Sequence, residues 1–359
     1  MYLAVLNQLC KTMKKFQVLL LVAACSALFS CKPRTTCIDE DMQETAVGLL
    51  QTEMKASACD SAVLLVMNVP TGEVRAQVKL ALDFATDTYV PVADKFVNVR
   101  VEPGPIIIPL TVMGSLDETN FTLQDPVNTG RGRLVLHQRT IYDEAVFDKG
   151  GYGIITFGQC VTLPSFVGTA QMLEWAYEGK LKAFEKRMVG MSLGQPSDKN
   201  PFDETPNFEA KMNAFSLGYY FKLSPTQILT AWNGLANDGK VMAPAVLPKD
   251  TGLVNPAMCK PATIQAMKAL LKENGVAELP EVPGTAFLKA VNSVKTTYTR
   301  MVTGSFCGYF PAEKPTYSCL VILYHSEAPD SDPEKGKTAL MESGKKVFAG
   351  MAKAYMTAD

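Results

Sequence analysis

The sequence has few histidines and almost no net charge, and each shortage excludes a class of protein. Only two histidines, His137 and His325, occur in 359 residues, and no Cys-x-x-Cys pair accompanies them, so we expect no metal site and no cofactor. Lys and Arg number 35 against 36 Asp and Glu, which excludes the basic face typical of nucleic-acid binders. With 47% hydrophobic and 20% charged residues, the composition is that of a globular protein rather than a disordered, collagen-like or coiled-coil one.

The chain also lacks an apolar run long enough to cross a membrane, but a shorter run lies near its start. Lys14 and Lys15 precede a mostly apolar segment from Phe16 to Phe29, whereas a membrane span needs about 20 apolar residues. This pattern predicts a secretory signal peptide over residues 1–30. The segment Leu28–Cys31 resembles a bacterial lipobox, in which the cysteine is acylated; the alternative is a plain signal peptide with a chance cysteine.

The lipobox interpretation predicts where the protein works. Cys31 would carry the lipid and become the new N-terminus, so we expect a cell-envelope protein anchored to a membrane and facing the periplasm or exterior. Residues 31–41 are polar and unpatterned, which predicts a tether, and residues 42–359 would form the folded domain. Six further cysteines could pair in 15 ways in an exported protein, but we favour buried free thiols in a domain of this size.

Hydrophobic patterning predicts an α+β fold. A continuous apolar run at 62–69, a turn at 70–72 and strict alternation at 73–79 predict a strand hairpin. Further strands are predicted at 302–310 and 316–325, helices at 42–55, 225–238, 261–274 and 337–355, and a pair of amphipathic helices over 169–188. We therefore expect one domain with two lobes, in which an antiparallel sheet joins chain-distant strands and a mostly helical lobe is inserted between them.

Local signals place two helices of the middle region. Ser224 can cap a helix that starts at Pro225, and Gln227 can complete a capping box. A second helix starts at Pro261, and Gly275 is the expected stop.

Five sequence islands resemble segments of one family in the correct order. The longest, residues 216–244, contains LSPTQILTAWNGLANDGK, which is similar to the pattern "lTPlQlltAyaalANgGk" of the transpeptidase domain of penicillin-binding proteins. The other islands are Val66–Val78, Val101–Gly104, Asp125–Gly130 and Ser305–Pro311. The resemblance implies the β-lactamase/transpeptidase-like fold and serine acyl transfer on the D-Ala-D-Ala end of a peptidoglycan stem peptide, which β-lactams mimic. In that family three motifs perform the chemistry: Ser-x-x-Lys, Ser-x-Asn and Lys-Thr-Gly.

The first motif is absent where the resemblance places it. After Pro103-Gly104, Pro105 falls on the position of the serine nucleophile and Ile108 on that of the lysine that activates it. The only Ser-x-x-Lys in the chain, Ser343–Lys346, lies after the third motif and is interpreted as chance sequence. We therefore expect no catalytic residue at these positions.

The second motif is also absent, and the third is partly kept. Pro164 and Phe166 fall on the Ser-x-Asn positions, with Ser165 between them, and no Ser-x-Asn occurs anywhere in the sequence. Lys and Thr of the third motif are present, but a threonine replaces the glycine that lets a substrate approach the strand closely. The resemblance implies that remaining substrate contacts would come from Ser165, Lys295, Thr296 and Thr297.

Three functional hypotheses follow. The first is a catalytically inactive transpeptidase-like lipoprotein that binds a stem peptide or a cell-wall synthesis or division protein, with a binding or scaffold role in peptidoglycan synthesis or cell division. The second is an active D,D-transpeptidase or carboxypeptidase-type enzyme with another nucleophile, for which Cys160 and Cys307 are candidates. The third is a peptide or small-molecule receptor that uses the old cleft. We favour the first, because losing the nucleophile or its base lowers turnover about 10⁶-fold in serine acyl transferases.

Overall fold

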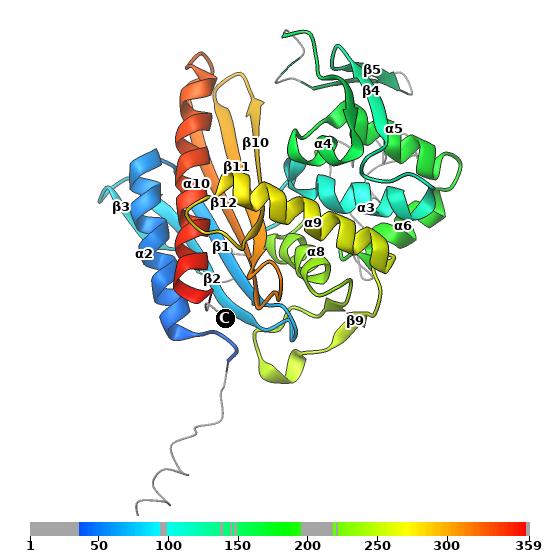
Figure 1. The fold of residues 1–359 in the computed structure, drawn as a ribbon. Coiled ribbons are helices and arrows are strands. Elements are labelled where there is room, and N and C mark those ends of the chain that lie inside the picture. Colours follow the sequence, from blue (N-terminus) through cyan, green and yellow to red (C-terminus); the bar gives the residue numbers. More distant parts are fainter. Residues whose placement is uncertain are drawn as a thin grey trace, which may run out of the picture.

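A six-stranded antiparallel sheet forms the centre of the molecule (Figure 1). The computed structural model describes residues 36–93, 99–136, 139–143, 146, 149–194, 218–219 and 222–356; residues 1–30 and Cys31 lie outside the described part. The strand order is β10-β11-β12-β1-β2-β3. The strands are β1 (Ser61–Asn68), β2 (Val74–Asp83), β3 (Thr88–Pro91), β10 (Ala286–Lys295), β11 (Arg300–Phe310) and β12 (Tyr317–Glu327). The pairing of β1 with β12 joins the two ends of the chain, which confirms the predicted antiparallel sheet of chain-distant strands.

One face of the sheet is covered by the N-terminal and C-terminal helices. Helices α2 (Glu40–Ser57) and α10 (Pro333–Tyr355) lie side by side across it (Figure 1). Their apolar side chains form one core with the strands, including Met42, Leu50, Phe306 and Phe348. Ser343 of the chance Ser-x-x-Lys belongs to α10 and is buried on this face.

The opposite face supports the helical lobe, by which we mean residues 104–278 in the described part of the chain. It contains the 3-10 turns η2 (Gly104–Ile107) and η4 (Pro248–Asp250), and helices α3 (Ile108–Glu118), α4 (Phe157–Thr162), α5 (Phe166–Tyr177), α6 (Leu181–Gly190), α8 (Pro225–Ala236) and α9 (Pro261–Glu278). Three small two-stranded sheets accompany them: β4 (Pro126–Gly130) with β7 (Gly153–Thr156), β5 (Arg133–Leu136) with β6 (Arg139–Tyr142), and β8 (Val241–Met242) with β9 (Leu253–Asn255). A second core joins this lobe to the sheet, since Trp232 and Leu229 cluster with Leu320 and Ile322.

The local predictions for the two middle helices meet different outcomes. The capping box is confirmed, because the Ser224 hydroxyl accepts from Gln227 N–H at 3.1 Å while the Gln227 side chain accepts from Ser224 N–H at 2.9 Å. The predicted stop at Gly275 is wrong, since α9 continues to Glu278. A Cβ at residue 275 would collide with the carbonyl oxygen of Thr285, so the glycine permits close packing of the helix rather than ending it.

The folded part of the chain also begins earlier than residue 42. Cys37 is 1% exposed, and its N–H donates to the carbonyl of Val246 at 2.7 Å. Asp39 caps α2 and forms an ion pair with Arg75 at 2.7 Å. The predicted tether over residues 31–41 therefore does not extend through Cys37–Asp41, because Cys37 and Asp39 contact the domain and Glu40 and Asp41 begin α2. None of the helices in the described ranges is long and apolar enough to cross a membrane.

Candidate functional site

The segment predicted to hold the first motif lies at the start of α3, against the edge strand β10. Gly104 opens η2 with a φ of +63°, and the side-chain amide of Asn292 on β10 lies against it. Gly104 N–H donates to the carbonyl of Gly218 at 2.9 Å. A Cβ on Gly218 would collide with the backbone of Gly104, so only glycine allows these two segments to approach so closely. The backbone before α3 is thus held on both sides.

Pro105 and Ile108 occupy one helical turn at this point. The N–H of Ile108 donates to the carbonyl of Pro105, which closes the turn between η2 and α3. Both residues are buried, and Ile106, Ile107 and Ile108 are each 0% exposed. The Trp232 indole N–H donates to the carbonyl of Ile106 at 3.2 Å. The segment therefore presents hydrocarbon, and neither position carries a hydroxyl, a thiol or an amine.

Ser165, which the resemblance offers as a substrate contact, is engaged inside the fold. Its hydroxyl donates to Oδ2 of Asp143 at 2.7 Å and accepts the N–H of Gly168 at 3.0 Å, which caps α5. The residue is 0% exposed, and the hydroxyl proton is already used. In this conformation Ser165 holds the start of α5 and has no proton to donate to a substrate.

Asp143 is a buried carboxyl group beside the second-motif segment. Burial raises its pKa, while hydrogen bonds from the Val167 N–H and the Ser165 hydroxyl oppose that shift. Pro164 and Phe166 flank the serine and are partly exposed, and the Phe166 ring meets that of Tyr219 edge-on at 6.0 Å. The amide expected of a complete Ser-x-Asn is replaced by an aromatic ring.

The third-motif residues lie at the tip of the β10–β11 hairpin. Lys295 is the last residue of β10 and pairs with Arg300; its side chain lies outside the described part of the structure. The Thr296 hydroxyl donates to the carbonyl of Thr299 at 2.9 Å and accepts its N–H at 3.1 Å, so it stabilises the turn. Thr297 is exposed in this turn rather than on the strand. The position that the resemblance assigns to a strand glycine therefore lies beyond the end of β10.

Both candidate thiols are buried and free. Burial raises the pKa of Cys160 to about 12, and the nearby Asp143 adds to the shift. Burial raises the pKa of Cys307 well above its usual range, with Cys319 as a second cause. A thiol with so high a pKa stays protonated at neutral pH and is a poor nucleophile.

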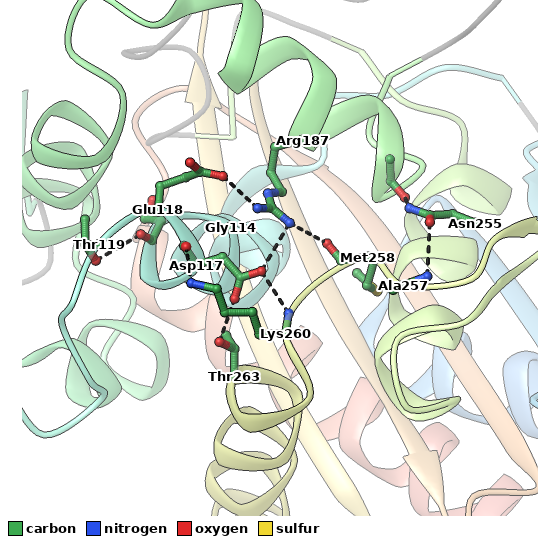
Figure 2. Close-up of polar contacts among 12 residues, drawn as sticks. Gly114, Asp117, Glu118, Thr119, Arg187, Asn255, Ala257, Met258, Lys260 and Thr263 are labelled. Carbon is green, nitrogen blue, oxygen red and sulfur yellow. Dashed lines mark hydrogen bonds and ion pairs between the residues drawn. The ribbon is translucent and has the colours of Figure 1, made fainter.

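A cluster of charged side chains fixes the far end of α3 (Figure 2). The Asp117 side chain is 2% exposed; its Oδ2 accepts from Lys260 N–H at 2.8 Å and lies 3.1 Å from Arg187 Nη1, and its Oδ1 accepts from the Thr263 hydroxyl at 2.6 Å. Arg187 also pairs with Glu118 at 2.6 Å and donates to the carbonyl of Met258 at 2.9 Å. Asp117 thus caps α9, whose N-cap residue Lys260 supplies no side-chain cap, and ties it to α3 and α6. Among the described residues, no group of three or more His, Cys, Asp or Glu side chains is arranged to hold a metal ion.

The family can now be stated from comparison with known proteins. The family model for the penicillin binding protein transpeptidase domain matches residues 62–342. The chain belongs to the penicillin-binding protein transpeptidase family.

Three solved structures are similar in fold to this chain. A peptidoglycan glycosyltransferase from Burkholderia ambifaria aligns with a TM-score of 0.70 at 22% identity, over 89% of this chain and 96% of that one. The transpeptidase domain of Burkholderia pseudomallei penicillin-binding protein 3 aligns with a TM-score of 0.69 at 20% identity, over the same shares. The transpeptidase domain of a D,D-transpeptidase, FtsI4, from Legionella pneumophila gives 0.60 at 14% identity, over 89% and 98%. The comparison with curated proteins found no match.

Sequence reasoning missed two carboxylates of this penicillin-binding protein transpeptidase domain. Asp143 meets Ser165, 22 residues away, and Asp117 meets Lys260, 143 residues away. Neither aspartate belongs to a local motif, so the sequence alone offers no signal for their partners.

Proposed function

We propose that this chain is a penicillin-binding protein transpeptidase domain without acyl-transfer activity, with a binding or scaffold role in peptidoglycan synthesis or cell division. The observation that carries the proposal is the turn at the start of α3, where Pro105 and Ile108 are buried side chains without a nucleophile or a base. The first step of acyl transfer forms a bond between a side-chain nucleophile and the carbonyl carbon. At this turn, neither Pro105 nor Ile108 offers a side-chain atom that could attack the carbonyl carbon.

The size of the expected defect supports an inactive protein. Removing the nucleophile or its base in a serine acyl transferase lowers turnover about 10⁶-fold, and here both positions lack the required group. Oxyanion stabilisation that survives in such a fold still needs an attacking atom before it contributes to rate.

The thiol hypothesis receives no support from the surroundings of the cysteines. Cys160 and Cys307 are each 0% exposed, and burial raises the pKa of both thiols. At pH 7 a thiol with a pKa of about 12 is about 10⁻⁵ thiolate.

Labelling with a fluorescent penicillin tests the proposal. The purified full chain, shown to be folded by circular dichroism, is incubated with the label beside an active penicillin-binding protein as the positive control. We expect no covalent label on gels and no increase of intact mass, while the control is labelled. A covalent adduct mapped by peptide mass spectrometry to any side chain of this chain would overturn the proposal.

We further propose that the domain is anchored in the cell envelope through a lipid on Cys31, on the strength of the lipobox-like segment and the preceding basic and apolar residues. Cys31→Ser tests this, because it removes the acceptor thiol and replaces it with a hydroxyl of similar size. Metabolic labelling with an alkyne fatty acid should mark the unaltered chain and not the variant, and the variant should leave the membrane fraction. Equal fatty-acid labelling of both chains would contradict the anchor.

The binding or scaffold role has its own test. In cells that make the protein, its depletion should change the rate or position at which a labelled peptidoglycan precursor is incorporated. A Lys295→Ala chain is then supplied in place of the original. Failure to restore incorporation would indicate a role of the third-motif segment, and full restoration would indicate a role of another surface. Unchanged incorporation after complete depletion would argue against any part in wall synthesis or division.

A further inference from the structure

A run of exposed apolar side chains lies on the segment Pro244–Ala257, which contains η4 and β9. Its large apolar residues Val246, Leu247, Leu253 and Val254 are 37%, 38%, 56% and 61% exposed. The charged residues of this segment are Lys249 and Asp250, so it carries no net charge. Single exposed apolar residues are ordinary, whereas several gathered on one surface segment are typical of a site that contacts another protein or a membrane.

Backbone hydrogen bonds hold this segment on the domain. Ala245 N–H donates to the carbonyl of Gly72 at 3.0 Å, and Val74 N–H donates to the carbonyl of Ala245 at 2.8 Å. Within the segment itself, Ala243 N–H donates to the carbonyl of Gly252 at 2.7 Å beside the pairing of β8 with β9. The exposed apolar side chains are therefore held at the end of the central sheet where β2 begins.

The chain enters the domain directly beside this segment. The N–H of Cys37 and the hydroxyl of Thr36 both donate to the carbonyl of Val246, at 2.7 Å and 3.1 Å. In Figure 1, α2 starts at the end of the molecule where β9 lies. Thr36 follows Cys31 by five residues, and five residues of fully extended chain span at most about 18 Å. A lipid on Cys31 would therefore keep the bilayer close to Val246 and its neighbours.

We propose that residues 244–257 form the membrane-facing surface of the domain, and that Leu247, Leu253 and Val254 enter the interface of a lipid bilayer. The proposal rests on the lipid anchor at Cys31 proposed above, to which it adds a defined orientation of the domain. A bilayer is the occupant that the anchor itself brings to this surface, whereas a second copy of the chain would have to enter the space between the domain and the membrane. Because the segment has no net charge, anionic headgroups do not repel it.

This orientation holds the opposite end of the sheet away from the membrane. β2 begins at Val74, beside the 244–257 segment, and ends at Asp83 after ten residues, a rise of about 30 Å. Phe84 follows at that far end and is 82% exposed. Phe84 and Leu253 are thus two exposed apolar residues at opposite ends of the sheet, so they form a matched pair for testing the orientation.

A polarity-sensitive dye on single introduced cysteines tests the orientation. The cysteines within the described ranges are all buried, so a thiol-reactive NBD dye should label Leu253→Cys or, as the control, Phe84→Cys. The lipidated full chain is reconstituted in vesicles of phosphatidylethanolamine and phosphatidylglycerol, and its sedimentation with them is checked first. We expect the dye at residue 253 to brighten several-fold and to be quenched by doxyl-labelled lipid. The dye at residue 84 should stay unchanged and remain accessible to aqueous iodide.

A pair of charged substitutions separates the surface from the anchor. Leu253→Glu together with Val254→Glu puts two carboxylates at the proposed membrane contact and leaves Cys31 intact. With the dye on Leu247→Cys, quenching by doxyl-labelled lipid should fall several-fold in this variant, because carboxylates are costly to bury in lipid, while the chain still sediments with the vesicles. Phe84→Glu in the same dye-labelled chain is the control and should leave the quenching unchanged.

Each failure has its own signature. A chain that sediments with the vesicles while the dye at residue 253 stays in water would overturn the membrane contact and leave the anchor standing. A chain that carries no lipid by intact mass and does not sediment would overturn both proposals. A dye at residue 253 that brightens without quenching by doxyl-labelled lipid would place a second copy of the chain on this surface, which would also overturn the membrane contact.

Discussion

At the scale of single residues, two buried aspartates have opposite surroundings. Asp117 faces Arg187 and two further donors, so its charge is compensated by an ion pair and hydrogen bonds. Asp143 faces a serine hydroxyl and backbone N–H groups, with no cation among its hydrogen-bond partners in the described ranges, and burial raises its pKa. Each therefore predicts a different response to substitution and to pH.

Replacing Asp117 should destabilise the protein strongly. Asp117→Ala removes the cap of α9 and leaves the half-buried Arg187 with Glu118 as its one remaining carboxylate partner among the described residues, so we expect a loss of about 3 kcal/mol in the free energy of unfolding. Urea denaturation measures it. Glu334→Ala is the matched control, because Glu334 is 76% exposed in its pair with Lys337 and should cost less than about 1 kcal/mol. Equal losses for both variants would contradict the role given to Asp117.

The raised pKa of Asp143 predicts a pH effect of definite sign. Between the ordinary aspartate value and the raised value, the folded state holds a proton that the unfolded state has lost. Asp143 therefore makes stability fall as pH rises through this window, and its effect is constant above it. At matched pH values, the unfolding free energy of the original chain is compared with that of Asp143→Asn. The value of the original chain minus that of the variant should decrease as pH rises across the window. A difference that is independent of pH would contradict the shift.

At the scale of secondary structure elements, glycines do different work in different helices. Gly48 on α2 is exposed, and a Cβ there would have nothing within 4 Å, so this glycine only costs helix stability. Gly275 on α9 faces the carbonyl of Thr285, where no Cβ fits.

These two glycines form a matched pair for one experiment. Gly48→Ala should raise the free energy of unfolding by about 0.5 to 1 kcal/mol, because alanine is the better helix former. Gly275→Ala should lower it by about 2 kcal/mol, because α9 must move from the strand region that it packs against. Thermal unfolding of both variants checks the opposite signs, and a stabilising Gly275→Ala would refute the packing argument.

The same elements show how far the sequence predicts the fold. The strand hairpin, the start of α8 and the C-terminal helix depend on signals within a few residues, such as Ser224 with Gln227, and these predictions are confirmed. The wrong prediction that Gly275 ends its helix has a physical reason. A local sequence pattern cannot predict that Gly275 packs against Thr285.

For the candidate site, too, the sequence predicted the segments but not their contacts. The family resemblance located the segments around Pro105 and Ser165, because motif order along the chain is a property of sequence. It did not reveal that the Ser165 hydroxyl is used by Asp143, or that Thr297 lies beyond the end of β10, because hydrogen bonds and strand ends depend on the assembled fold.

At the scale of the whole molecule, the central sheet is shared by two cores. Phe306 and Phe348 belong to the core beneath α2 and α10, while Trp232 packs with Leu320 and Ile322 beneath the lobe. Alternate residues of β12 belong to opposite cores. Unfolding of either core would therefore expose one face of the strand that the other core needs.

This arrangement predicts one cooperative unfolding transition. Trp175→Phe leaves Trp232, which is 0% exposed, as the only tryptophan, so its fluorescence reports the lobe core alone. Far-UV circular dichroism reports all helices. We expect the two denaturant midpoints to coincide, and separate midpoints would show that the lobe unfolds independently of the sheet.

The buried turn at Pro105–Ile108 also constrains any change that would introduce a serine nucleophile there. A lysine introduced at residue 108 would place an ammonium group where Ile108 is now 0% exposed, and an unpaired charge in such a dry place costs several kcal/mol. A serine at residue 105 alone would gain nothing without that amine. Each single substitution is therefore either costly or without benefit, so a descendant of this protein could acquire an acylating serine at this turn only by rebuilding the surrounding packing at the same time.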